Sequence, residues 1–402
     1  MKYPSEFIAA IPKNDLHVHL DGSLRLETLI ELAADQGVEL PAETPEGLRE
    51  KVFKPSYKDL NEYLKGFAYT CKVMQDRASL ERIAYELAED NINEGVRYME
   101  VRFAPQLHIS ADLNFKDVMI AVDNGLRRAR DEFNSKLGAD DPQFEYGIIV
   151  TAMRFFTPAF SRYYSDLASV HQYSSDDELI KMASLELAKA AVDLKNNSDI
   201  QVVAFDLAGS EYGYPASAHQ EAYDYVQSHF LNKTVHAGEA YGPESIFQAI
   251  TKLHADRIGH GLRLFRPDMI YDEEVTDHGR YVADLANYIA NKRITIEVCL
   301  TSNLQTCPDI ETPEAHSLGQ MLENNLSLTI CTDNRLVSNT TVTKEIEMAI
   351  EAFDISPKQL KNIMIYGFKR GFYYGSYQEK RQFVRRIINY YEALEEKFAI
   401  SG

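Results

Sequence analysis

Two histidines separated by one residue end the first apolar run of the chain, in the segment His17-Val18-His19. Because side chains alternate between the two faces of a strand, both imidazoles are expected to point to the same side. Two imidazoles on one face supply half of a typical zinc site, although two buried histidines that only form hydrogen bonds fit the same pattern. This segment alone therefore leaves metal binding open.

Three further polar motifs follow later apolar runs. They contain His236 and Glu239 in the tetrapeptide HAGE, His260 between two glycines, and the pair Asp333-Asn334. Histidines combined with an aspartate form an N/O ligand set suited to zinc, and a glutamate beside such a site typically moves protons in hydrolysis. Each motif taken alone also fits an ordinary turn or helix cap.

The apolar runs that precede these motifs alternate with longer amphipathic stretches. Near-continuous apolar runs separated by helical patterns predict parallel strands that are buried on both faces. The predicted strands are Asp15–Leu20, Val96–Phe103, Tyr146–Met153, Val202–Leu207, Thr234–His236, Arg257–Gly259, Thr295–Leu300 and Ser327–Thr332. The predicted helices are Arg25–Gln36, Leu80–Glu94, Phe115–Glu132, Asp177–Asn196, Ala216–Phe230, Glu244–Leu253, Gly279–Asn291 and Glu314–Asn324. Eight such units predict an α/β fold, a single (β/α)8 TIM barrel with extra helices that covers residues 1–402.

A barrel of this kind brings distant motifs together. The four motifs follow the first, fifth, sixth and eighth predicted strands, and barrels carry their active sites at the C-terminal ends of their strands. Unrelated core histidines have no reason to collect at that end. The sequence therefore predicts a divalent metal site at the barrel mouth, with the ligands His17, His19, His236 and Asp333.

Three stretches fall outside this alternation. Thr44–Gln75 has apolar residues at helical spacing between the first two strands, which fits either a lid over the active face or a helical pair packed on its own apolar side. Ser161–Asp176 is rich in Ser, Tyr and Asp and is expected to be an exposed loop. Glu379–Ile400 is expected to be a C-terminal amphipathic helix with a solvated charged face.

The charge balance narrows the functional classes. The net charge of -19 disfavours binding to nucleic-acid phosphates and to anionic membranes. We see no secretory signal and no apolar run of membrane length, and the four scattered cysteines are typical of reduced thiols, so we expect a cytoplasmic protein. Motifs of serine hydrolases, P-loop proteins, dinucleotide-binding proteins and cytidine-type deaminases are missing. Nothing in the sequence indicates the oligomeric state.

Six segments of the chain, taken in order, resemble the adenosine deaminases of the amidohydrolase superfamily. They are Pro12–Ser23 (PKNDLHVHLDGS), Asp206–Glu211 (DLAGSE), His236–Glu239 (HAGE), Arg257–Gly261 (RIGHG), Glu297–Asn303 (EVCLTSN) and Cys331–Asn334 (CTDN). The resemblance covers most of the chain, and the combination of motifs is specific. It implies a (β/α)8 barrel with one zinc ion per chain. It also implies that a zinc-activated water deaminates adenosine, and 2′-deoxyadenosine as well, to inosine and ammonia.

The resemblance further implies a role for each motif residue. The zinc ligands would be His17, His19, His236 and Asp333. Glu239 would protonate the purine ring, and His260 would orient or deprotonate the attacking water. Gly209 would contact a ring nitrogen through its backbone, and Asp21 would contact a ribose hydroxyl.

One position departs from the family pattern, because Asn334 stands where many members carry a second aspartate. An asparagine can donate an N–H to an unprotonated purine N7, whereas an ionised aspartate cannot, so purine binding is retained on physical grounds. The base specificity is less fixed than the chemistry. Two alternatives stay open, namely a deaminase of another 6-aminopurine or N6-substituted purine nucleoside, and a non-catalytic purine-binding barrel.

Overall fold

The structure is a computed structural model that describes residues 3–138 and 141–400, so the extreme ends of the predicted domain range lie outside the described residues. Eight parallel strands pair in chain order. They are β1 (Lys13–His19), β2 (Val96–Phe103), β3 (Glu145–Met153), β4 (Val202–Ala208), β5 (Asn232–Ala237), β6 (Arg257–His260), β7 (Thr295–Val298) and β8 (Ser327–Ile330). Every residue of β1 and β4 is buried, as expected for strands that are covered on both faces.

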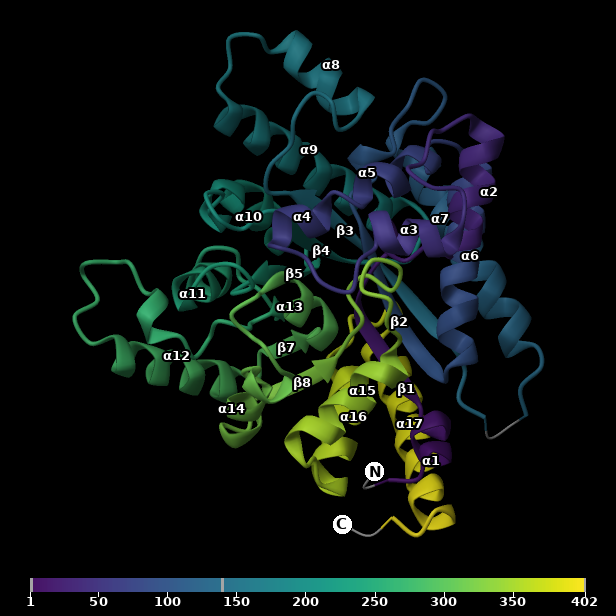
Figure 1. The fold of residues 1–402 in the computed structure, drawn as a ribbon, viewed down its shortest axis with the longest axis vertical. Coiled ribbons are helices and arrows are strands. Elements are labelled where there is room, and N and C mark those ends of the chain that lie inside the picture. The colour runs from purple at the N-terminus through teal and green to yellow at the C-terminus, as the bar shows by residue number, and fades with distance from the viewer. Residues whose placement is uncertain (1–2, 139–140, 401–402) are drawn as a thin grey trace.

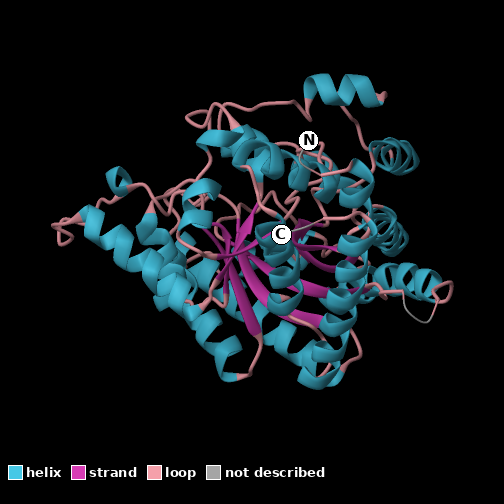
Figure 2. Ribbon diagram, turned by 90° about the horizontal axis from the view of Figure 1, so that it is seen from below, coloured by secondary structure: helices cyan, strands magenta, loops and turns pink. Residues whose placement is uncertain are grey.

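Helices follow the strands and surround them. Figure 2 shows the strands at the centre of the molecule with helices around them, and Figure 1 gives the order of the elements along the chain. The α-helices are α1 (Ser5–Ala10), α2 (Leu26–Gln36), α3 (Pro45–Lys51), α4 (Leu60–Leu64), α5 (Phe67–Thr70), α6 (Arg77–Asn93), α7 (Phe115–Asn134), α8 (Arg162–Val170), α9 (Asp176–Asn197), α10 (Gln220–Ser228), α11 (Pro243–Thr251), α12 (His278–Lys292), α13 (Leu300–Thr306), α14 (Leu318–Glu323), α15 (Val342–Phe353), α16 (Pro357–Arg370) and α17 (Tyr377–Lys397).

The barrel closes between its first and last strands. The backbone N–H of His19 donates to the carbonyl of Asp333 at 2.7 Å, and the N–H of Asp333 donates to the carbonyl of His17 at 2.8 Å. Val18 and Asp333 form the corresponding parallel bridge. The closure confirms the predicted (β/α)8 fold and places the HxH segment directly beside the aspartate that follows β8.

The expectation of an exposed loop over Ser161–Asp176 is wrong, because α8 occupies the first half of this stretch. Ser161 caps the helix by accepting the N–H of Tyr164 at 3.4 Å. The side chain of Tyr164 is fully buried and stacks on Phe156. The polar composition of the stretch concealed a helix whose inner face packs through Tyr164, with the partly buried Tyr163 and Leu167 in the same cluster.

Two other elements begin or end at residues that differ from the predicted ones. The strand predicted over Thr295–Leu300 stops at the end of β7, and Leu300 already begins α13. Leu300 is fully buried, and an apolar residue suits the end of a buried strand as well as the start of a buried helix, so its character does not distinguish the two. The helix predicted over Glu314–Asn324 shortens to α14, because the His316 side chain accepts the N–H of Leu318 at 3.0 Å.

The stretch Thr44–Gln75 does not form a simple helical pair. It folds into the short helices α3, α4 and α5, and it packs on the loop after β8 through two buried tyrosines. The hydroxyl of Tyr57 donates to the carbonyl of Val337 at 3.3 Å, and the hydroxyl of Tyr63 lies 2.8 Å from Ser338 Oγ. This loop also carries Asp333, so the segment lies next to the predicted metal site.

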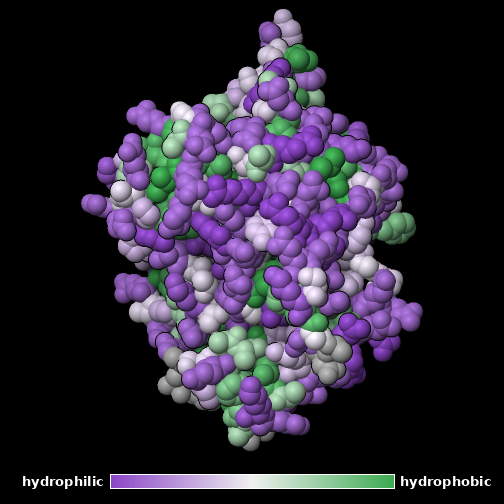
Figure 3. Space-filling model, turned by 90° about the vertical axis from the view of Figure 1, so that its right-hand side faces the viewer, coloured by the Kyte–Doolittle hydropathy of each residue, from purple (hydrophilic) through white to green (hydrophobic). Residues whose placement is uncertain are grey.

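The outer surface is strongly polar. On the face shown in Figure 3, hydrophilic residues predominate and hydrophobic residues form small separated areas. No helix within the described ranges is long and apolar enough to cross a membrane. Helix α17 covers most of the expected C-terminal helix, and two of its acidic residues, Glu392 and Glu395, pair with Lys361 of α16 at 3.1 and 2.7 Å.

Candidate active site

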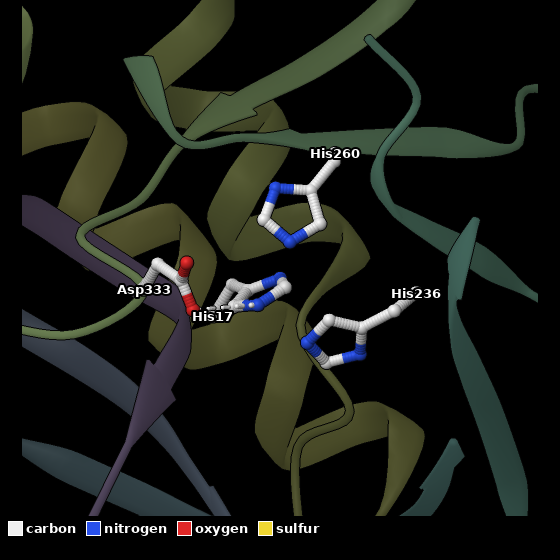
Figure 4. Close-up of side chains that lie close together, drawn as sticks. All are labelled: His17, His236, His260 and Asp333. Carbon is white, nitrogen blue, oxygen red and sulfur yellow. Dashed lines mark ion pairs between the residues drawn. The ribbon is translucent and has the colours of Figure 1, made fainter. Parts of the chain in front are cut away.

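Four side chains from separate strand ends converge at the barrel mouth. The ligand atoms of His17, His236, His260 and Asp333 lie within 4.8 Å of one another, and all four residues are buried. Figure 4 shows the three rings and the carboxylate around one shared space, with the ion pair between His17 and Asp333 marked. They come from β1, β5, β6 and the loop after β8, as the positions of the motifs predict.

His19, the remaining predicted ligand, lies at the edge of the same cluster. Its Nε2 is 3.0 Å from His236 Nε2 and 3.4 Å from Asp333 Oδ1. Two imidazole Nε2 atoms at this distance are stable when one is protonated and the other is not, or when a cation lies between them. The structure thus brings all four predicted ligands together and adds His260 as a fifth donor.

An unsatisfied nitrogen faces the centre of this cluster. His17 Nδ1 bonds to Glu297 Oε2 at 2.8 Å, whereas His17 Nε2 is buried without a hydrogen-bond partner. A histidine that binds a metal typically donates its other N–H to a carboxylate, which fixes the tautomer and turns the second nitrogen toward the ion. Since imidazole and carboxylate donors are also the set that zinc prefers, the residues fit a zinc ion.

The other two rings of the cluster are held by different kinds of partner. His236 Nδ1 lies 3.1 Å from a carboxylate oxygen of Asp206, much as His17 Nδ1 lies against Glu297, whereas His260 Nδ1 accepts the amide N–H of Asn303 at 3.0 Å. His260 has a φ of 66°, a left-handed conformation that is uncommon for a side chain of this size. These contacts fix each imidazole with one nitrogen directed away from its partner and toward the barrel mouth.

Buried guanidinium groups keep the supporting carboxylates charged. Arg102 donates to Glu297 at 2.8 Å and to Asp206 at 3.2 Å, and Arg257 donates to Glu297 at 2.6 Å. Burial by itself would raise the pKa of Glu297, but the two guanidinium groups outweigh it and hold that pKa well below its usual range. Glu297 therefore remains an anion and can accept the N–H of His17.

Glu239 is a buried acid next to the imidazole cluster. Its Oε2 lies 3.7 Å from His260 Nε2. Burial raises the pKa of the Glu239 carboxyl well above its usual range, and the negative charges of Asp333 and Glu211 raise it further. A raised pKa favours the protonated carboxyl, the form that can donate a proton as a general acid requires.

The predicted substrate contacts surround the cluster on other loops. Asp21 is buried, and its Oδ1 has no hydrogen-bond partner. Gly209 follows β4 with a φ of 100°, a conformation that favours glycine. Asn334 donates an amide N–H to the hydroxyl of Tyr63 at 2.9 Å, while its buried Oδ1 has no partner and packs against Gly22. The polar atoms left free at Asp21 and Asn334 are suited to a polar ligand.

Comparison with known proteins shows the family of the chain. The adenosine deaminase family model matches residues 12–177 and 175–390. Adenosine deaminase 1 of Streptomyces coelicolor is 35% identical to this chain, over 92% of this chain and 85% of that protein. The adenosine deaminase of Mycobacterium tuberculosis is also 35% identical, over 91% of this chain and 90% of that protein. The chain belongs to the adenosine deaminase family.

Solved structures agree with the fold of this family. An adenine deaminase from Arthrobacter aurescens superposes with a TM-score of 0.74 at 21% identity, covering 95% of this chain and 100% of that one. An N6-mAMP deaminase from Arabidopsis superposes with a TM-score of 0.73 at 25% identity, covering 96% and 99%. Family membership makes the chain a hydrolytic deaminase of the metal-dependent amidohydrolase type.

Several residues that support the site in this deaminase were not assigned a role from the sequence. They are Glu297, Asp206, Asn303, Ser302, whose hydroxyl donates to Asp333 at 2.6 Å, and Glu211. A signal for two of them is present in the sequence, because Glu297 and Asp206 are single carboxylates inside otherwise apolar strands. Buried charges are almost always paired, so such positions indicate a nearby partner.

Proposed function

We propose that this chain deaminates adenosine and 2′-deoxyadenosine to inosine and ammonia with one zinc ion. The observation that carries the proposal is the position of Glu239, a buried acid 3.7 Å from His260 at the edge of a donor cluster suited to zinc. The two relatives at 35% identity are both named adenosine deaminases, which supports the same substrate here.

The ligands proposed for zinc are His17, His19, His236 and Asp333. They meet around Nε2 of His17, a buried nitrogen that has no hydrogen-bond partner and lies 3.4 Å from Asp333 Oδ1. A bound zinc ion acts as a Lewis acid that lowers the pKa of a water molecule to about 7. The supporting contacts of Glu297 and Asp206 hold His17 and His236 ready for this role.

The remaining residues are assigned steps that need no further cofactor. Glu239 donates its proton to the purine ring, which makes the carbon that carries the amino group more electrophilic. His260 orients or deprotonates the attacking water. One proton of that water passes to the amino group, so that the bond between the ring carbon and the amino nitrogen breaks and ammonia leaves, and the other proton returns to Glu239. Asp21 accepts a hydrogen bond from a ribose hydroxyl, and the backbone of Gly209 contacts a ring nitrogen. Asn334 contacts the opposite edge of the purine.

We also propose that residues 1–402 act as one catalytic unit in which residues 44–75 form a lid. Two contacts support a lid at this position, those of Tyr57 with Val337 and of Tyr63 with Asn334, because they join the segment to the loop after β8. The cysteines of the described chain are free thiols, in keeping with the proposed cytoplasmic location.

A substrate panel with metal control tests the proposal. The loss of absorbance is followed for adenosine and 2′-deoxyadenosine beside adenine, AMP and N6-methyladenosine, with and without the chelator dipicolinate. We expect turnover of adenosine and 2′-deoxyadenosine that the chelator abolishes and that added zinc restores. Preferred turnover of N6-methyladenosine or adenine would instead support the second candidate, a deaminase of another purine, for which the departure at Asn334 is the structural reason. No turnover of any member by zinc-loaded protein would exclude the proposal.

A further inference from the structure

A second group of donor atoms shares no residue with the imidazole cluster. Asp21, Cys71 and His108 offer a carboxylate, a thiol and an imidazole whose ligand atoms lie within 4.8 Å of one another, the same limit that the imidazole cluster meets. They come from three places that are distant in sequence: the loop after β1, the 3-10 turn Cys71–Val73, and the residue after the 3-10 turn Pro105–Leu107. The fold assembles this group, so its members do not share a location merely as sequence neighbours.

Two of the three side chains are buried and unsatisfied. His108 is fully buried, and its Nε2 has no hydrogen-bond partner. Asp21 is 4% exposed, and its Oδ1 has no partner either. A buried polar atom without a partner is unfavourable, and a bound ligand would satisfy both atoms.

The tautomer of His108 is fixed by its other nitrogen. His108 Nδ1 lies 3.2 Å from the carbonyl oxygen of Met74, which can only accept a hydrogen bond. Nδ1 therefore carries the proton, and Nε2 presents a lone pair. Burial lowers the pKa of His108 to about 4, so this lone pair is available near neutral pH. A carbonyl behind one imidazole nitrogen is also the usual support of a metal-binding histidine.

The two segments that carry Cys71 and His108 are joined by one side chain. The amide of Gln75 donates to the carbonyl of Cys71 at 2.7 Å and to the carbonyl of Leu107 at 3.2 Å. Ser110 Oγ donates in turn to the carbonyl of Gln75 at 3.3 Å. These bonds hold the thiol and the imidazole in place before any ligand binds.

We propose that Asp21, Cys71 and His108 form a second, separate cation site that takes a thiophilic divalent ion such as Zn²⁺ or Cd²⁺. A mixed N, O and S donor set selects such ions, whereas Mg²⁺ and Ca²⁺ require oxygen donors. On binding, the S–H bond of Cys71 breaks and a bond between sulfur and the cation forms. The thiol proton leaves to solvent, and nothing is oxidised or reduced.

Occupation of this site is inhibitory, and this part of the proposal rests on the proposed function. Asp21 is the residue proposed to accept the ribose hydroxyl, and its carboxylate cannot serve the sugar while it binds a cation. The second ion therefore competes with the nucleoside. Asp21 follows His19, a proposed ligand of the catalytic zinc, by only two residues. The loop after β1 therefore contributes both to catalysis with one zinc ion and to inhibition by a second ion.

Cadmium titration of the zinc-loaded protein tests the site without any use of activity. We expect one additional Cd²⁺ per chain, together with the ultraviolet charge-transfer band of a thiolate bound to cadmium. The imidazole cluster contains no sulfur, so exchange of its zinc produces no such band. Cys71→Ser should abolish the band, and His108→Gln should weaken cadmium binding at least tenfold. The matched controls Cys307→Ser and His171→Gln should keep the charge-transfer band and the affinity for cadmium. A band of full size in Cys71→Ser, or no additional cadmium, would overturn the site.

Inhibition is then measured separately. Excess Zn²⁺ should raise the KM for adenosine without lowering kcat, and Cys71→Ser should shift this inhibition to at least tenfold higher zinc. Equal inhibition of wild type and Cys71→Ser would overturn the inhibitory role. If the cadmium band depends on Cys71 while no adenosine is deaminated at one zinc per chain, the cation site is supported and the proposed function fails.

Discussion

The carboxylate of Glu211 accepts the backbone N–H of Glu239 at 3.0 Å. The same carboxylate accepts the neighbouring N–H groups of Gly238, Ala240 and Tyr241 at 2.7–2.9 Å, and also the hydroxyl of Ser245. Four successive backbone donors thus surround one buried anion, in the manner of an anion-binding nest. The loop that carries the proposed proton donor is therefore shaped by a residue on a different loop, after β4.

Replacing Glu211 by Gln should slow the reaction without removing the metal. A carboxamide has a single acceptor oxygen, and its NH2 group opposes the backbone N–H donors, so the Glu239 loop loses its shape. We expect kcat to fall about 10–100-fold, the range typical of a lost supporting contact, with a smaller change in KM. Ser245→Ala, which removes one of the five bonds, should have a weaker effect. Wild-type kcat in Glu211→Gln would contradict this role.

The role of Glu239 as proton donor is tested by Glu239→Gln. The amide keeps the shape of the side chain and cannot supply an acidic proton, so kcat should fall by about 10²–10⁴-fold. The zinc content, measured by atomic absorption, should stay at one per chain, because Glu239 is not a proposed ligand. Near-normal turnover, or loss of the metal, would refute the assignment.

Five donors meet around the proposed ion, and metal content distinguishes their roles. His19 and His260 should behave differently, although the imidazoles of both lie near that of His236. His19→Asn should lower the zinc content together with activity, because His19 is a proposed ligand. His260→Asn should retain zinc and lose kcat, because His260 is assigned to the attacking water. If His19→Asn retained its zinc and His260→Asn lost it, His260 would be the zinc ligand and His19 would act on the attacking water.

The barrel could be predicted from the sequence because each strand is covered on both faces and is therefore a continuous apolar run. The two shortest predicted strands, Thr234–His236 and Arg257–Gly259, became convincing only through the motifs that follow them. The sequence did not predict α8, which lies in a stretch rich in Ser, Tyr and Asp and packs inward through Tyr164 and its neighbours. Tertiary packing decides such elements, and local pattern does not reveal it.

The main residues of the candidate site could be predicted from the sequence for a similar reason. Parallel strands bring their C-terminal ends together, so His17 and Asp333 could be expected to meet although more than 300 positions separate them. Their supporting partners could not be paired in the same way. The contact of His17 with Glu297 depends on the register of the barrel and on which face of β7 points inward. Those features follow from the packing of all eight strands.

Buried neutral histidines should make the protein sensitive to acid. Burial, together with the charge of Arg154, lowers the pKa of His219 to about 3, and burial with the charge of Arg263 lowers the pKa of His316 to about 3. The unfolded chain, with ordinary histidines near pKa 6.5, binds these protons more readily than the folded chain. Each histidine therefore contributes stability that is present above pH 6.5 and is lost as the pH falls through the folded value.

Between those limits the free energy of unfolding should fall by about 1.4 kcal/mol for each pH unit and each such histidine. His219→Gln isolates one of them. Glutamine can keep the hydrogen bond to Ser184 Oγ, which His219 makes at 3.0 Å, but it cannot titrate. Urea unfolding from pH 7 to pH 4.5 should therefore show a shallower loss of stability in His219→Gln than in wild type. The exposed control His171→Gln should follow the wild type. A difference between His219→Gln and wild type that does not change with pH would mean that the folded protein protonates His219 as readily as the unfolded chain does.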